Sequence, residues 1–342
     1  MLKNWDKRKL VPLIILIVFL GFWQINKFQR TSHYLGISGT TMGPITYNIK
    51  YADQENRNLQ PAIDSILNDF NNALSTYVEN SEISLFNITD SIIYQSPYLF
   101  PVFAESKKIY TATDGAFDPT VGPLVNAYGF GPGSERVIDA LNFDSLLDLV
   151  GFDNVSFDNV MAKKSIKGSY LDFSAIAKGY AVDVIHSYLR SCNITDFMVE
   201  IGGEVSCFGR NPDGNIWRIG IEDPMVSDDE VRLKATVELK DLTMATSGNY
   251  RNFYEIDGKK YSHTINPKTG NPVEHSLLSV SVFAPTCMTA DAFATSFMVM
   301  GLEKSLEKVN LIDSVEAFFI YANEQGAVET IATDGIKKMI TQ

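Results

Sequence analysis

Helical and β-type hydrophobic patterns occupy separate blocks of the chain, and this constrains the fold more than any other feature. Apolar residues recur at helical spacing at Leu59–Leu74 and Ser174–Arg190, whereas β-rich runs dominate from Phe197 to Thr246. A parallel sheet with crossover helices needs regular alternation of strands and helices, which this order lacks. We therefore expect an α+β fold with mixed, largely antiparallel sheets and flanking helices.

The remaining expected elements follow from the same patterns and from turn residues. Ser174 is expected to cap its helix, and Asp257-Gly258 is expected to form a hairpin turn. Another helix and a final hairpin are expected after Met300. The expected strands are 45–51, 197–205, 217–222, 231–239, 242–246, 253–256, 260–265 and 278–284, and the further expected helices are 102–113, 143–150 and 285–300.

The first 30 residues differ in composition from the rest. Leu10–Ile25 is nearly all apolar, and four basic residues precede it. Sixteen helical residues span about 24 Å, a little less than a bilayer core. Because basic flanks stay cytoplasmic, we expect an inner-membrane anchor with the remainder exported to the periplasm. The expected division is 1–30, a cytoplasmic tip with an anchor or signal segment, and 31–342, the globular domain.

The same leader is compatible with two different roles. A cleaved signal peptide fits the pattern, although no small-x-small cleavage site directly follows the apolar run. A buried helix of the globular domain is a further interpretation, but it would not explain why basic residues are concentrated before the apolar run.

Charge and cysteine content exclude several classes of function. The chain has 29 basic and 41 acidic residues, a net charge of −12, which disfavours nucleic-acid binding through a basic surface. The three cysteines, Cys192, Cys207 and Cys287, fit neither a closed disulfide framework nor a CxxC metal site. The sequence has no P-loop, no dinucleotide-binding glycine fingerprint after a strand and no GxSxG motif.

A carboxylate and a hydroxyl lie one helical turn apart near the C-terminus. Asp291 and Thr295 share a helix face, and such hard oxygen ligands suit Mg²⁺. An acidic residue near a helix start and a Thr bonded to a preceding carbonyl are the structural alternative.

Three further segments offer groups for chemistry. Asp172 precedes a helix start that can bind an anion, and Lys178 lies one turn further on. His263 lies near a strand end and could act as a base, although a single histidine is more often structural. Gly115–Thr120 resembles an ordinary turn when taken alone.

Taken in order, these segments resemble the ApbE family of FAD:protein FMN transferases. The resemblance covers residues 40–301, and we therefore expect the mixed-sheet, T-fold-like architecture of that family. The matching blocks are Thr41–Gly43, Ser81–Asn87, Gly115–Gly131, Asp172–Asp183, Val199–Glu204, Ala245–Phe253, Ser262–His275 and Ala284–Thr295.

The resemblance implies a set of site residues. His263 is the candidate for the base, both by its position in the family blocks and by its chemistry. Glu200, Glu204 and Arg251 also lie in family blocks and are assigned only supporting roles. The positions implied for Mg²⁺ are Asp291, Thr295 and the main-chain carbonyl of Ala175. The positions implied around FAD are Met42, Tyr77, Ala116, Phe117, Asp118, Asp172, Lys178 and Ile265.

The resemblance also implies the reaction and its partners. The FMN part of FAD is expected to pass to a Thr or Ser hydroxyl of a target flavoprotein, with Mg²⁺ as cofactor and AMP as product. The expected targets are subunits of membrane redox complexes of the Rnf or sodium-pumping quinone reductase type. Many relatives are lipoproteins, but no lipidated cysteine follows the leader here. Two alternative functions remain open: an FAD pyrophosphatase that releases FMN and AMP, and a periplasmic FAD carrier without catalysis.

Overall fold

The computed structural model describes Phe19 and residues 33–132, 143–225, 232–249, 253–256, 259–262 and 264–341. The leader other than Phe19, as well as His263 and Arg251, lies outside these residues. Within the described ranges no helix is long and apolar enough to cross a membrane.

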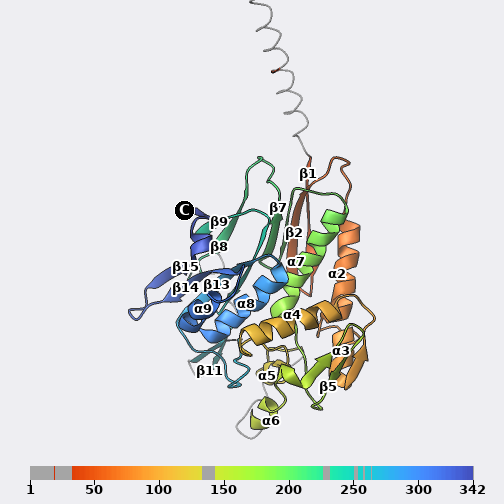
Figure 1. Ribbon diagram of the computed structural model, residues 1–342, viewed down its shortest axis with the longest axis vertical. Coiled ribbons are helices and arrows are strands. Elements are labelled where there is room, and N and C mark those ends of the chain that lie inside the picture. The colour runs from red at the N-terminus through yellow and green to blue at the C-terminus, as the bar shows by residue number, and fades with distance from the viewer. Residues whose placement is uncertain are drawn as a thin grey trace, which may run out of the picture.

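An eight-stranded sheet forms the centre of the molecule (Figure 1). Its neighbouring strands all pair antiparallel, which confirms the expected α+β class. In spatial order its strands are β1 (Tyr34–Thr41), β2 (Ile45–Ala52), β6 (Phe197–Ile201), β7 (Glu204–Phe208), β10 (Leu242–Gly248), β13 (Leu277–Ala284), β14 (Glu316–Ala322) and β15 (Val328–Ala332).

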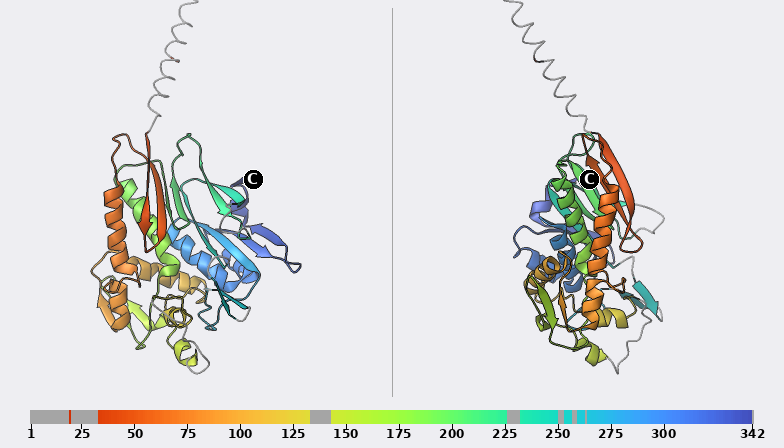
Figure 2. Two further views of the ribbon diagram at one scale, coloured as in Figure 1. Left: turned by 180° about the vertical axis from the view of Figure 1, so that it is seen from behind. Right: turned by 90° about the vertical axis from the view of Figure 1, so that its right-hand side faces the viewer.

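Each face of this sheet is covered by a different layer. Helices α2 (Gln60–Leu74), α4 (Leu99–Ala112), α7 (Ser174–Ser191) and α8 (Cys287–Met300) bury one face in the main hydrophobic core. A smaller sheet of β16 (Ile340–Thr341), β9 (Leu233–Leu239) and β8 (Trp217–Glu222) packs on the opposite face through a second core. Figure 2 shows the large sheet from behind and from its side.

Short elements gather beyond one end of the large sheet, in the lower part of Figure 1. Phe103 of α4 lies within 6.3 Å, between ring centroids, of Phe86, Phe152 and Phe173, so aromatic packing fills this region. These elements are α3 (Glu82–Ile88), α5 (Gly122–Ala127), α6 (Phe143–Leu147), the 3-10 helix Phe152–Asn154, the sheet β3 (Ser91–Ile93), β5 (Met161–Lys164) and β4 (Val155–Phe157), and the hairpin β11 (Phe253–Ile256) and β12 (Lys259–Ser262). α9 (Leu302–Val309) and α10 (Asp334–Lys337) complete the fold.

Several expected boundaries are wrong for identifiable reasons. The run 197–205 is two strands, because Gly202 and Gly203, both at positive φ, turn the chain between β6 and β7. Ser174 does not cap α7: it is the first helical residue, and its N–H donates to Oδ1 of Asp172 at 2.8 Å. The 143–150 helix ends at Leu147, and the strand expected at 260–265 ends at Ser262. Strand β1 has no counterpart among the expected strands.

Candidate functional site

Helices α7 and α8 pack unusually closely where Gly179 meets the first turns of α8. A Cβ at Gly179 would overlap the carbonyl oxygen of Cys287 and lie 2.7 Å from Cβ of Asp291. A glycine inside a helix costs about 1 kcal/mol relative to alanine, so the position needs a packing reason. That reason is the close approach, which brings Asp291 against the backbone of α7.

Asp291 is buried and oriented by this contact. Its Oδ2 accepts a hydrogen bond from the Gly179 N–H at 2.9 Å, and its side chain is 3% exposed. The regular helical acceptor of that N–H is the carbonyl oxygen of Ala175, four residues earlier. The Asp291 carboxylate therefore bonds to α7 one helical turn after Ala175, whose carbonyl is the expected main-chain ligand.

Thr295 lies one turn after Asp291 on the same helix. Its Oγ1 is 3.2 Å from Oγ of Ser247, on the sheet strand β10, which packs against α8. The expected i, i+4 relationship between carboxylate and hydroxyl is thus present. The hydroxyl is half-buried and held from the sheet side.

Lys178 sits between two acidic side chains. Its Nζ is 2.5 Å from Oε1 of Glu204 and 3.8 Å from Oδ1 of Asp291. Burial lowers the pKa of Lys178, but the Asp291 and Glu204 carboxylates outweigh this and raise it above its ordinary value. Burial raises the pKa of the Glu204 carboxyl, and the Lys178 ammonium opposes that shift. We conclude that the ammonium stays protonated and that Glu204 is its main partner.

The start of α8 is held by a carboxylate from α7. Asp183 accepts hydrogen bonds from the N–H groups of Cys287 and Met288, each at 2.8 Å, and Thr286 accepts one from Thr289 as the N-cap. Burial raises the pKa of Asp183 to about 7, although these two N–H groups lower it. This contact fixes the axial position of α8 and hence of its acidic residue one turn later.

The Gly115–Thr120 segment forms a second group around Asp118. Its carboxylate is buried and accepts from the N–H and hydroxyl of Thr120, at 2.8 and 2.5 Å, and from the N–H of Phe152 at 3.2 Å. Burial is the main reason why the pKa of Asp118 is raised. The N–H of Asp172 donates to the carbonyl of Pro119 at 2.7 Å, so this segment adjoins the start of α7.

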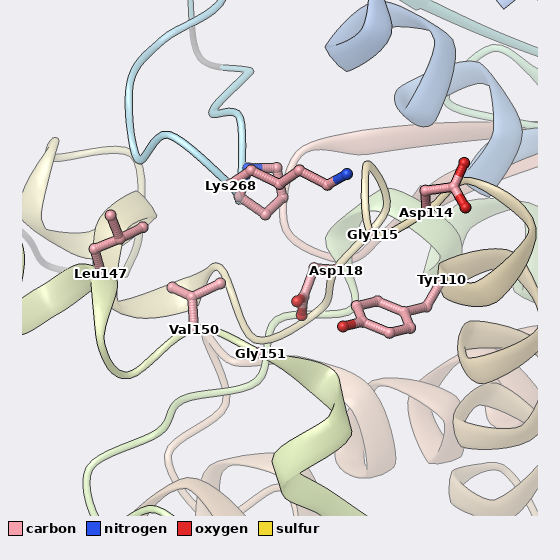
Figure 3. Close-up of a pocket in the computed structure, with 9 residues that line it drawn as sticks. Tyr110, Asp114, Gly115, Asp118, Leu147, Val150, Gly151 and Lys268 are labelled. Atoms are coloured by element: carbon pink, nitrogen blue, oxygen red, sulfur yellow. The ribbon is translucent and has the colours of Figure 1, made fainter.

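A cavity of about 330 Å³ opens beside this second group (Figure 3). Lys268 extends along one side of it, with Asp118 and Tyr110 across from the ammonium and Leu147 and Val150 at the other end. Gly115, at φ +78°, and Gly151, at φ +148°, also line it. Polar groups of both signs and two apolar side chains therefore surround the same space, which suits an organic ligand with polar substituents.

The other expected FAD positions lie on several different elements. Ala116, Phe117 and Ile265 are buried, and Ile265 packs with Leu124 and Tyr128. Met42 occupies the β1–β2 turn at φ +49° and packs partly against the main core. Tyr77 is 67% exposed, and its hydroxyl donates to the carbonyl of Phe130 at 3.3 Å.

The structure thus brings Lys178 and Asp291 together, with Thr295 one turn after Asp291 on α8, and it links the Asp118 loop to Asp172 through the backbone. The sequence did not single out Gly179, Asp183 or Ser247 as site residues, and it indicated only a supporting role for Glu204. A glycine inside an amphipathic helix was the one available signal for Gly179.

The donor set fits a hard divalent cation. A carboxylate, a hydroxyl and a main-chain carbonyl are oxygen ligands of the kind Mg²⁺ takes, with waters or substrate phosphates completing its shell. Within the described ranges no group of three or more His, Cys, Asp or Glu residues could hold a metal ion. The metal position expected here uses one carboxylate and is therefore of a different kind.

Fold and site together define an α+β protein with a buried carboxylate between two closely packed helices, beside a lysine. The family model of the ApbE family matches residues 42–319. The chain belongs to the ApbE family.

Individual relatives agree over nearly the whole chain. An FAD:protein FMN transferase of Vibrio cholerae is 40% identical over 315 residues, which are 89% of this chain and 90% of that protein. One of Haemophilus influenzae is 36% identical over 326 residues, 91% of this chain and 93% of that protein. The solved flavin transferase ApbE from Vibrio cholerae superposes with a TM-score of 0.81 at 38% identity, covering 90% of this chain and 99% of that one.

Proposed function

We propose that this chain transfers the FMN part of FAD to a Thr or Ser hydroxyl of a target protein and releases AMP. The family and its transferase members support the reaction class. The observation that supports the proposed site is the buried Asp291 carboxylate, which bonds to the α7 backbone at Gly179 and lies 3.8 Å from the Lys178 ammonium, with Thr295 one helical turn further along α8. Oxygen ligands, an ammonium and a helix N-terminus are the groups that a pyrophosphate requires.

The hydroxyl oxygen of the target forms a bond to the phosphorus on the FMN side of the pyrophosphate. The bond from that phosphorus to the bridging oxygen breaks, and AMP leaves with the electron pair. The hydroxyl proton passes to a base, for which we propose His263, a residue outside the described part of the chain. The product is a phosphoester that links FMN to the target.

Asp291, Thr295 and the Ala175 carbonyl would hold Mg²⁺. When bound, this ion neutralises pyrophosphate oxygens and the charge that develops on them. Lys178 adds a fixed positive charge on the same side of α7. We propose that Met42, Tyr77, Ala116, Phe117, Asp118, Asp172 and Ile265 line the rest of the FAD site, with Asp118 keeping its loop in place.

The decisive experiment mixes the full-length chain in detergent with FAD, Mg²⁺ and a flavin-acceptor subunit. A denaturing gel viewed for in-gel flavin fluorescence should show a fluorescent acceptor band that disappears with EDTA. AMP and free FMN without such a band would indicate an FAD pyrophosphatase. Intact FAD with no band would indicate a carrier.

His263→Ala tests the proposed base. FAD should still bind, measured by quenching of flavin fluorescence, while transfer slows by roughly 10²- to 10⁴-fold. Loss of FAD binding would instead make His263 a binding residue.

We also propose that residues 1–30 anchor the chain in the inner membrane, with residues 31–342 in the periplasm. Acceptor subunits of Rnf-type or sodium-pumping quinone reductase complexes would then be within reach of the site. An alkaline phosphatase reporter fused after residue 30 should be active, because this enzyme needs export to form its disulfides. An inactive alkaline phosphatase fusion, with an active cytoplasmic reporter at the same position, would overturn this topology.

A further inference from the structure

The geometry points to Glu204 as a positioning residue that holds the Lys178 ammonium away from Asp291 and so keeps that carboxylate free for a divalent cation. This inference rests on the proposed metal role of Asp291. It concerns a residue outside the expected FAD and metal positions. Three features of the structure carry it: the unequal sharing of the ammonium, the fixed position of Glu204, and the uncompensated burial of its second oxygen.

The ammonium is shared unequally between the two acidic side chains. Nζ of Lys178 lies 2.5 Å from Glu204 Oε1, a direct hydrogen bond, but 3.8 Å from Asp291 Oδ1. At 3.8 Å an ammonium and a carboxylate still attract each other but make no hydrogen bond. Without Glu204, the nearest strong acceptor for the ammonium would be Asp291, and an ammonium bonded there would compete with a metal ion.

The backbone around Glu204 fixes its position. Gly202 and Gly203, at φ +60° and +98°, form the turn directly before it. The Gly202 N–H donates to the carbonyl of Thr46 at 3.0 Å, and the Gly203 N–H donates to Oε1 of Glu200 at 2.8 Å. Both bonds tie the turn to the sheet, so Glu204 begins β7 at a defined place.

The same turn confines the stem of Lys178. A Cβ at Gly202 would lie 2.7 Å from Cγ2 of Ile45, 3.4 Å from Cδ of Lys178 and 3.6 Å from Oε2 of Glu204. The lysine stem, the turn and the carboxylate are therefore in close packing contact. This packing places the lysine stem against the turn that carries Glu204.

Glu204 is retained at an energetic cost. Its side chain is 1% exposed, and Oε2 has no hydrogen-bond partner within the part of the chain that the structure describes. A buried carboxyl oxygen without a partner has lost its hydration without a compensating hydrogen bond, which destabilises the fold. Stability alone therefore does not account for a glutamate at this position.

The test measures Mg²⁺ binding directly, by isothermal titration calorimetry on the full-length chain without FAD or acceptor. Glu204→Leu keeps the buried volume but removes the acceptor, and we expect the Kd for Mg²⁺ to rise at least about tenfold. The double variant Glu204→Leu with Lys178→Met removes the competing ammonium as well. Its Kd should return to within about threefold of that of Lys178→Met alone, because both then lack the competitor.

An unchanged Kd in Glu204→Leu, or a double variant that binds as weakly as Glu204→Leu, would overturn the inference. Glu316→Gln is the control, because Glu316 is likewise a hydrogen-bonding glutamate on a strand of the large sheet. It accepts the N–H of Gly335 at 3.1 Å but lies on β14, away from α7. Its Kd for Mg²⁺ should equal that of the wild type. A wild type that binds no Mg²⁺ would also overturn the inference.

Glu204→Gln is the second variant in case Glu204→Leu does not fold. It keeps an oxygen acceptor for Lys178, so its Kd should rise less, and Lys178→Met should again cancel the rise. Because binding is measured without FAD, failure of the proposed transferase reaction would appear only in the acceptor gel.

Discussion

The amide nitrogen of Gly179 lies 2.9 Å from Oδ2 of Asp291, so the backbone of α7 is a hydrogen-bond donor to the carboxylate of α8. The two residues are 112 positions apart in the chain. A side chain at position 179 would fill the space that permits this contact. The orientation of the proposed metal ligand therefore depends on a residue that has no side chain.

Gly179→Ala should displace α8 from α7. The added Cβ meets backbone atoms of Cys287, which cannot move aside as a flexible side chain can. Overpacking of this kind costs about 1–3 kcal/mol, and the Asp291 contact should lengthen. Thermal unfolding and Mg²⁺-dependent transfer should both show the loss.

Gly36→Ala is the matched control, since a Cβ at Gly36 meets nothing within 4 Å. Its melting temperature and activity should stay near those of the wild type. A Gly179→Ala variant with wild-type melting temperature and Mg²⁺ dependence would show that the helix pair tolerates the extra methyl group.

Asp118→Asn should weaken FAD binding through the loop that Asp118 holds. An asparagine can still accept from Thr120, but its NH₂ group would then face the N–H of Phe152, which donates to Oδ2 in the wild type. One buried N–H is left unpaired, at a cost of about 1–3 kcal/mol. We expect a higher KM for FAD with a smaller change in kcat.

Asp158→Asn provides the comparison for that variant, because Asp158 accepts backbone N–H groups of Val160 and Met161 in an exposed turn. It should leave the KM for FAD unchanged. Equal kinetic effects of the two substitutions would argue against a special role for the Asp118 loop.

Stability at acid pH should depend on Asp53. The side chain of Asp53 is 4% exposed and accepts from Nε and the backbone N–H of Arg57, at 2.9 and 2.8 Å. Hydrogen bonding to the Arg57 side chain is the main reason why the pKa of Asp53 is lowered from 3.8 to about 2. A carboxyl with a depressed pKa stabilises the fold above its unfolded-state pKa, and this stabilisation is lost as pH falls from about 4 to about 2.

Urea unfolding of the wild type and Asp53→Asn at pH 7, 4 and 2.5 measures this. The wild type should be more stable at pH 7, and the gap in unfolding free energy should shrink below pH 4. A gap that is the same at pH 7 and pH 2.5 would contradict the assignment.

Local patterns predicted the parts of the site that lie within one element. The spacing of Asp291 and Thr295 placed them on one face of α8 because a helix repeats every 3.6 residues. The antiparallel α+β class followed from the order of the hydrophobic patterns. The first prediction needed only neighbouring residues, and the second needed only the order of such local patterns along the chain.

Contacts between distant elements were not predictable in the same way. Glu204 reaches Lys178 only because the β6–β7 turn is tied to Thr46 of β2, and such strand pairing has no local signal. The apolar pattern also continues through Gly202-Gly203, which is why 197–205 was expected to be one strand. Strand β1 was missed because Gly36 and Gly39 weaken its β-propensity. In the structure the space over Gly39 is filled by the ring of Tyr47.

Thr295→Val should separate the ligand role of this hydroxyl from its packing role. Valine keeps the branched shape of threonine but removes Oγ1, so the contact with Ser247 and the proposed bond to Mg²⁺ are both lost. Ser247→Ala removes only the partner of the hydroxyl. Loss of such a supporting group typically weakens metal binding by about 10- to 100-fold, and loss of the ligand itself should weaken it further. Calorimetric Kd values for Mg²⁺ should therefore increase in the order wild type, Ser247→Ala, Thr295→Val.

Thr295→Ser, which restores a hydroxyl, should bind nearly as well as the wild type. Equal Mg²⁺ affinities for Thr295→Val and the wild type would remove Thr295 from the proposed ligand set and leave Asp291 as its only side-chain member.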